Sequence, residues 1–178
     1  MMKKFNSILN ILLTVFVLLF FSNSSIADVY EHPAALSSIA EKIPVIESVK
    51  CKFKQEKTMP NIAKPLVSGG DFEFVKDKGV YFYTLYPIKS TVDYTNKNYK
   101  QVNDIVKAIS AKKYEKLEKE FSFFFTGNSG NWTLGLKPKQ NSSAKNYITS
   151  ITIQGSSYIN QININQTNGN KTAIWFIK

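Results

Sequence analysis

The chain has no arginine, one histidine and one cysteine among its 178 residues, and each scarcity excludes a class of chemistry. A single cysteine excludes an intramolecular disulfide. A Ser-His-Asp triad would have to use His32, and no Gly-x-Ser-x-Gly elbow is present. No His, Cys, Asp and Glu cluster offers metal ligands, and Ser68-Gly69-Gly70 lacks the Gly-Lys-Ser/Thr of a phosphate loop. We therefore expect a protein that is not an enzyme and has no metal or cofactor.

Positive charge is abundant but comes from lysine alone. The chain has 23 basic and 13 acidic residues, a formal net charge of +10. A basic balance is compatible with nucleic acid or anionic lipid as a partner. However, no more than two lysines are adjacent, and bidentate reading of bases favours arginine. The pattern favours a solvated surface and no nucleic-acid partner.

The N-terminus has the pattern of a secretory signal peptide. Lys3 and Lys4 precede an apolar run over residues 8–21, and Ser25 and Ala27 are small residues at the −3 and −1 positions. A membrane anchor is the alternative, but a span needs about 20 apolar residues and this run is shorter. We expect cleavage after Ala27, which makes 1–27 a signal peptide and 28–178 one exported domain.

The region 47–87 predicts three strands. Val49, Cys51 and Phe53 alternate with lysines, as in a strand with one apolar and one solvated face. This alternation indicates that Cys51 is a small buried residue and not a nucleophile. After an excursion over 60–65 and the Ser68-Gly69-Gly70 stretch, strands are expected at 71–76 and 80–86.

Two segments have helical periodicity. Residues 32–44 place apolar side chains at helical spacing, with Pro33 suited to a first helical turn. After a fourth strand over 88–94, residues 102–119 carry an apolar stripe that is interrupted near Ser110 and Ala111. We expect two amphipathic helices, the second broken at that point.

The rest of the chain predicts antiparallel strands. Alternating apolar residues mark strands at 121–126, 132–136, 149–153, 158–166 and 172–177, and Asn168-Gly169 is a hairpin turn. The order of helix, strands, helix and strands is typical of an α+β fold.

Several short motifs together resemble the periplasmic outer-membrane lipoprotein carriers. They are Phe53-x-Gln55-Glu56-Lys57, Lys64-Pro65-Leu66-x-Ser68-x-Gly70-x-Phe72, Gly79-Val80-Tyr81 with Tyr86-Pro87, and Trp132-x-Leu134-x-Leu136-x-Pro138. The resemblance covers roughly residues 33–177 and lies in the order and spacing of the parts. It implies a half-open antiparallel β-barrel with a helical lid over an apolar concave cavity.

The same resemblance implies a function. Such a protein is a periplasmic carrier, or chaperone, that shields the acyl chains of lipoproteins or of another lipid cargo between the inner and outer membranes. Its partners would be that cargo, an inner-membrane release complex and an outer-membrane acceptor, and it would be a monomer. Carriers of this kind have an arginine under the lid. Because this chain has none, that closing device is absent or replaced by a lysine.

Cavity-lining candidates are the apolar residues of the alternating strands and of the second helix, which we expect to be the lid. The alternative is that these side chains form a filled core, as in a non-carrier binding or scaffold protein of the envelope. The sequence specifies neither the cargo nor the donor and acceptor. The candidates are Val49, Cys51, Phe53, Phe72, Phe74, Phe82, Ile105, Ile109, Phe123, Trp132, Leu134, Ile151 and Ile162.

Overall fold

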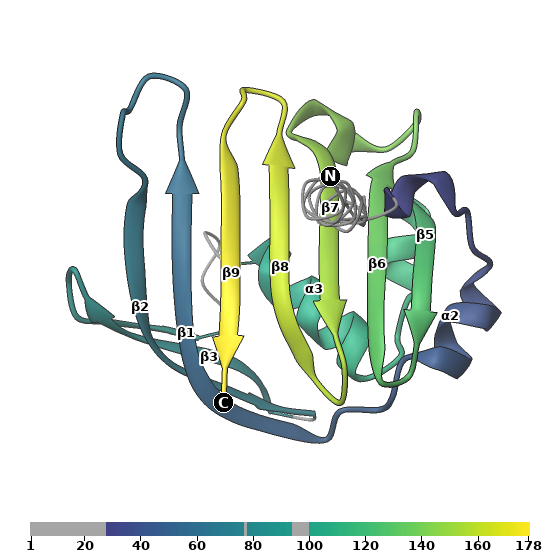
Figure 1. The fold of residues 1–178 in the computed structure, drawn as a ribbon, viewed down its shortest axis with the longest axis horizontal. Coiled ribbons are helices and arrows are strands. Elements are labelled where there is room, and N and C mark those ends of the chain that lie inside the picture. The colour runs from purple at the N-terminus through teal and green to yellow at the C-terminus, as the bar shows by residue number, and fades with distance from the viewer. Residues whose placement is uncertain (1–27, 77, 94–99) are drawn as a thin grey trace, which may run out of the picture.

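A computed structural model describes residues 28–76, 78–93 and 100–178, and its main feature is one antiparallel sheet of nine strands. The proposed signal peptide and its cleavage site lie largely outside these residues. The strand order is β4-β3-β2-β1-β9-β8-β7-β6-β5, so the sheet is open, with β4 and β5 at its edges (Figure 1). The strands are β1 (Ser48–Thr58), β2 (Leu66–Val75), β3 (Gly79–Tyr86), β4 (Ser90–Asp93), β5 (Phe121–Asn128), β6 (Asn131–Pro138), β7 (Ile148–Gly155), β8 (Ile159–Gln166) and β9 (Lys171–Ile177).

Short helices complete the α+β fold. Helix α3 lies behind the sheet in Figure 1, and α2 lies beside the β5 edge. The helices are the 3-10 turn η2 (Val29–Glu31), α2 (Leu36–Lys42), α3 (Lys100–Ser110), α4 (Glu115–Glu120) and the 3-10 turn η4 (Ser143–Asn146). In the described part of the chain, no helix is both long enough and apolar enough to cross a membrane.

One face of the sheet packs against α3 and forms the core; we call it the covered face. Strand alternation places Phe53, Phe82, Leu134, Ile162 and Ile174 on it, all at most 4% exposed. These side chains and those of α3 belong to one continuous apolar cluster. The α+β class and the alternating pattern expected from the sequence are therefore confirmed.

The opposite, outer face is solvated. Lys50 pairs with Glu73 across β1 and β2 at 3.1 Å, and Lys52 pairs with Asp71. These ion pairs are exposed and so contribute little stability each. The prediction that the lysines of β1 face water is confirmed.

Strand β2 is longer than expected, because Gly69 and Gly70 lie within it. The sequence suggested a break there. A Cβ on Gly70 would lie 2.0 Å from the carbonyl oxygen of Tyr83, and one on Gly69 would lie 2.2 Å from the Tyr86 hydroxyl. The glycines therefore permit close approach of β3 at an irregular point of the β2–β3 register.

Helix α2 is shorter than expected and excludes Pro33. It begins at Leu36, whereas residues 32–34 run along the β5 edge. There the Ala34 N–H donates to the Phe123 carbonyl at 3.0 Å, and the Phe125 N–H donates to the His32 carbonyl at 2.9 Å. Pairing with an otherwise open strand edge thus decides the conformation of this segment.

The second helical segment breaks where the sequence indicated. Helix α3 ends at Ser110 and α4 begins at Glu115, and Lys112 between them has a φ of 54°. A left-handed residue ends the helical path, because its backbone cannot continue the right-handed ladder.

Candidate functional site

The predicted cavity residues lie together on the covered face, but most of the space between them is filled. All of them except Cys51 are buried, with 0–8% of their surface exposed. Under α3, the void lined by Val49, Phe72, Phe74 and Val106 measures only about 10 Å³. No large cavity is therefore shown around these four residues, because α3 places its own apolar side chains against the sheet there.

Cys51 is half-buried and packs against the core without being enclosed. Cys51 lies on β1 next to the end of β9. The last β9 residue, Ile177, pairs with Lys52, so no β9 residue pairs with Cys51. Burial raises the pKa of the Cys51 thiol, although the nearby Lys178 opposes this effect. The thiol is therefore protonated at neutral pH, but the expectation that Cys51 is buried is wrong, because the strand beside it ends and leaves it half-exposed.

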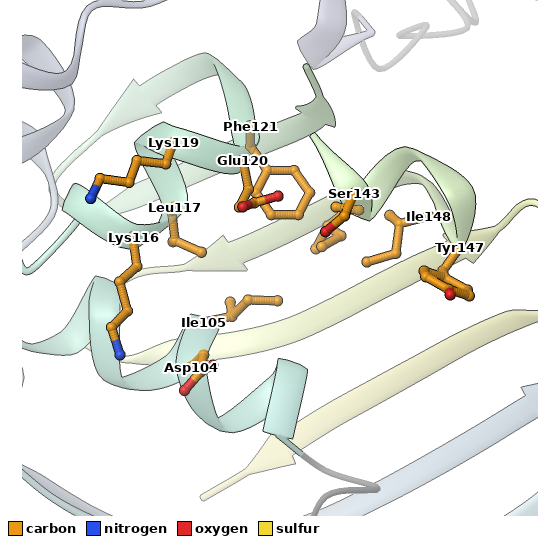
Figure 2. Close-up of a pocket in the computed structure, with 12 residues that line it drawn as sticks. Asp104, Ile105, Lys116, Leu117, Lys119, Glu120, Phe121, Ser143, Tyr147 and Ile148 are labelled. Atoms are coloured by element: carbon orange, nitrogen blue, oxygen red, sulfur yellow. The ribbon is translucent and has the colours of Figure 1, made fainter. Parts of the chain in front are cut away.

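A hollow of about 500 Å³ does exist at one end of the covered face. It lies between α3, α4, η4 and the strands β5 and β7, and Figure 2 shows Ile105, Leu117 and Ile148 around its middle. Of the predicted cavity residues, it includes only Ile105 and Ile151. Its apolar lining comes from Ile105, Leu117, Phe121, Ala144, Ile148 and Ile151.

The rim of the hollow is polar and includes two exposed lysines. Lys116 and Lys119 come from α4, and Figure 2 shows them on one side of the hollow with Tyr147 on the other. Asp104, Glu120 and Ser143 complete the rim. The rim thus carries two carboxylates and two ammonium groups, and an anionic head of an amphiphile whose tail fills the apolar interior would meet the lysine side.

The hollow arises because short elements meet around it. The four residues between α3 and α4 turn the chain, and α4 has only six residues. Opposite it, η4 is held by the Ser142 hydroxyl, which accepts from the Ala144 N–H at 2.9 Å, and by the Lys139 N–H, which donates to the Glu120 carbonyl at 2.9 Å. These short elements leave a gap that longer helices would cover.

Sequence reasoning missed Leu117, Phe121, Ala144 and Ile148 as lining residues. Leu117 belonged to the apolar stripe of the second helix, and Phe121 began an aromatic strand, so both had a signal of burial. Neither signal distinguishes a side chain that fills the core from one that borders a hollow. Ala144 lies in a polar loop and had no signal.

Tyr114, just before α4, carries a buried hydroxyl beside the core. Its ring meets Phe123 edge-on with centroids 6.5 Å apart, and the hydroxyl has no hydrogen-bond partner among the described residues. Burial raises the pKa of Tyr114 to about 12. The hydroxyl therefore stays neutral at all physiological pH values.

Lys112 connects the turn between α3 and α4 to α2. Its ammonium donates to the carbonyl oxygen of Ala40 at 2.6 Å. Carbonyls in the last turn of a helix have no partner within the helix and attract positive charge. One lysine thus bonds two of the helical segments that border the covered face.

Comparisons with known proteins give structural similarities only. No protein-family model matches the chain, and no curated protein sequence matches it. Among solved structures, it is similar to a LolA superfamily protein from Nitrosomonas europaea, with 7% identity over 82% of this chain and 92% of that chain and a TM-score of 0.33.

Two further structures are similar over most of this chain. A DUF1329 family protein from Desulfovibrio piger has 10% identity over 83% of this chain and 89% of that chain, with a TM-score of 0.32. Transferrin binding protein B from Neisseria meningitidis has 9% identity over 82% of this chain and 26% of that chain, with a TM-score of 0.25. At these TM-scores the similarities place the chain in no family and carry no functional argument.

Proposed function

We propose that the protein is an exported, non-enzymatic carrier that holds an acyl chain of a lipid or an acylated protein in the hollow beside α4. The carrying observation is the apolar hollow of about 500 Å³ with Lys116 and Lys119 on its rim. This volume falls within the roughly 300–1,000 Å³ of small-molecule sites. Burial of an acyl chain contributes about 0.8 kcal/mol per methylene, so an apolar lining suffices for binding.

The motif resemblance supports the finer form of this proposal. In that form the protein works in the periplasm as a monomer, takes an acylated lipoprotein or another lipid from an inner-membrane donor, and delivers it to an outer-membrane acceptor. The hollow measures about 500 Å³ in the present conformation. A cargo with several acyl chains would require α3 to move away from the covered face.

The filled covered face favours a second candidate. Ile109, Leu134 and Ile162 are fully buried and do not line the hollow, so most of the predicted cavity needs no ligand to exclude water. A protein with this core could act as a non-carrier binding or scaffold protein of the cell envelope. The two candidates differ in whether the hollow is occupied in the cell.

Native mass spectrometry of the protein purified from cells tests the proposal. The carrier predicts a co-purifying mass of a lipid or an acylated peptide, which denaturation releases. A mass that is always that of the protein alone, together with no uptake of added fatty acid, would instead support the scaffold.

A substitution that fills the hollow tests whether the ligand binds there. Ala144 lines it, so Ala144→Trp should occupy part of its volume and abolish fatty-acid binding while the fold persists. Ala35→Trp is the matched control, because Ala35 is exposed and does not line the hollow. Equal binding by both variants would remove the hollow as the site.

A substitution on the rim of the hollow tests whether a lysine contacts the head group of the ligand. Lys116→Gln should weaken binding of a fatty-acid anion but leave binding of its neutral methyl ester unchanged. Lys113→Gln serves as the control, since Lys113 is also exposed and does not line the hollow. An equal effect on acid and ester would show that the ammonium does not meet a head group.

A further inference from the structure

Three loops that are distant in the sequence lie side by side at one edge of the molecule. We call residues 57–67, 139–147 and 167–171 the loop edge. Thr58 pairs with Lys171 where β1 and β9 meet, and the Pro60 ring lies 2.8 Å from where a Cβ on Gly169 would be. The first and third loops are therefore in contact (Figure 1).

The middle loop is joined to the same edge by hydrogen bonds. The Thr167 N–H donates to the Tyr147 carbonyl at 3.1 Å, and the Thr167 hydroxyl donates to the Asn146 carbonyl at 3.0 Å. Residues up to 114 positions apart in the sequence thus form one continuous rim along the ends of the strands.

The loop edge is basic and carries no acidic residue. Its charged residues are Lys57, Lys64, Lys139, Lys145 and Lys171, and neither Asp nor Glu occurs in the three segments. On the outer face, by contrast, lysines alternate with carboxylates and form the ion pairs Lys50–Glu73 and Lys52–Asp71. The Glu120 carboxylate accepts from the Ser142 hydroxyl of the middle segment, so one carboxylate adjoins the five lysines. The resulting excess of positive charge at the loop edge is complementary to an anionic surface.

Large apolar side chains are exposed among these lysines. Leu66 is 55% exposed, Ile62 43% and Tyr147 64%. Tyrosine and aliphatic side chains that project beside lysines are the combination that enters the boundary between lipid head groups and acyl chains. Tyr147 also lines the hollow, so the loop edge borders the mouth of the candidate site.

We propose that the loop edge docks on the surface of a membrane that contains anionic lipid. The lysines meet the lipid phosphates, and Ile62, Leu66 and Tyr147 enter the interfacial layer. Docking in this way places the mouth of the hollow beside the bilayer. The inference does not depend on the hollow taking an acyl chain, because it concerns binding to the membrane surface without cargo.

Vesicle flotation tests the docking with the exported protein. Vesicles of phosphatidylcholine mixed with phosphatidylglycerol should bind it at low salt, and vesicles of phosphatidylcholine alone should bind it far more weakly. Because each lysine near an anionic bilayer contributes roughly fivefold in affinity, Lys64→Gln with Lys171→Gln should weaken binding about 25-fold. Raised salt should have the same effect on the unaltered protein.

A matched pair of variants tests whether the loop edge itself, and not the positive charge of the whole protein, binds the vesicles. Lys78→Gln with Lys113→Gln removes the same charge from exposed positions outside the loop edge and should change the affinity little. All variants are made with the same N-terminus, so a difference in vesicle affinity between them comes from the substituted lysines alone. Equal losses in the two pairs, or no binding to either kind of vesicle at low salt, would overturn the proposal.

A fluorescence test places the apolar side chains. The emission of Leu66→Trp should shift to shorter wavelength on anionic vesicles, and that of Val45→Trp, an exposed position outside the loop edge, should not. A fold check by circular dichroism accompanies each variant. If sedimentation instead shows a dimer that Ile62→Ser with Leu66→Ser disperses, the edge is an interface between copies and the membrane assignment is wrong.

Discussion

The ammonium of Lys112 lies 2.6 Å from the carbonyl oxygen of Ala40 and so bonds the turn after α3 to the last turn of α2. Lys112 itself has a left-handed φ of 54°. In a chain with no arginine, this is a lysine that holds two helical segments together through a backbone carbonyl.

Lys112→Met should lower the free energy of unfolding by about 1 kcal/mol, because it removes a half-buried, charge-assisted hydrogen bond. Lys113→Met, the neighbouring exposed lysine, should change it by less than about 0.5 kcal/mol. Urea denaturation measures both. Lys112→Gly should cost less than Lys112→Met, since glycine relieves roughly 1–2 kcal/mol of left-handed strain. Equal stabilities for the Met variants at 112 and 113 would show that the Ala40 bond contributes nothing.

Helix α3 is expected to move as a lid although it is packed in this conformation. Amide exchange should be faster in residues 102–110 than in the central strand residues 132–136, because a lid must open at low free-energy cost. Ile105→Asp should weaken closure and leave the sheet folded. Ile153→Asp, on strand β7, should unfold the protein, since both side chains are at most 2% exposed but only Ile153 lies in the sheet. Exchange in α3 as slow as in β6 would make the helix a fixed part of the core.

Removal of the Tyr114 hydroxyl should stabilise the protein at neutral pH. The hydroxyl is buried without a partner among the described residues, and such a group costs about 1–3 kcal/mol. We expect Tyr114→Phe to raise the free energy of unfolding by about 1 kcal/mol in urea denaturation. A clear loss of stability would indicate a partner that the present conformation does not show.

The same residue gives a pH dependence with a definite sign. The folded pKa of Tyr114 is raised from 10.0 to about 12, so between these values the unfolded chain binds fewer protons than the folded chain. Ionisation of Tyr114 therefore has no effect on stability well below pH 10, and it lowers the free energy of unfolding progressively as the pH rises from 10 through 12. The loss amounts to at most about 3 kcal/mol. The difference in stability between the protein and Tyr114→Phe should change across this window and stay constant between pH 6 and 9.

Processing of the N-terminus should leave Asp28 as the first residue. The motive is the pair of small residues Ser25 and Ala27 behind a short apolar run. The Asp28 carboxylate that would follow the cleavage site accepts from the Tyr30 N–H at 3.1 Å and caps η2. N-terminal sequencing of the protein in the periplasmic fraction checks this. An intact Met1 in the membrane fraction would show an anchor instead.

The sequence by itself determined the local structure. The two-residue alternation in β1 and in β5–β9 predicted which side chains are buried, because successive side chains in a strand point to opposite faces. Asn168-Gly169 predicted a hairpin turn, and Gly169 indeed has a positive φ of 81°. The break after Ser110 was also visible, since the apolar stripe of the helix stops there.

Only the tertiary structure decided where space remains and which loops meet. Ile105 borders the hollow, whereas Ile109 fills the core. This difference depends on how the side chains of α3, α4, η4 and two strands fill the space between them, which no local sequence pattern predicts. The pairing of Lys54 with Trp175 joins β1 to β9 across most of the chain and brings the loops of the loop edge together. Alternation along a strand decides which face of the sheet a side chain occupies, and that depends only on the local sequence. Which residues it contacts depends on the order of all nine strands.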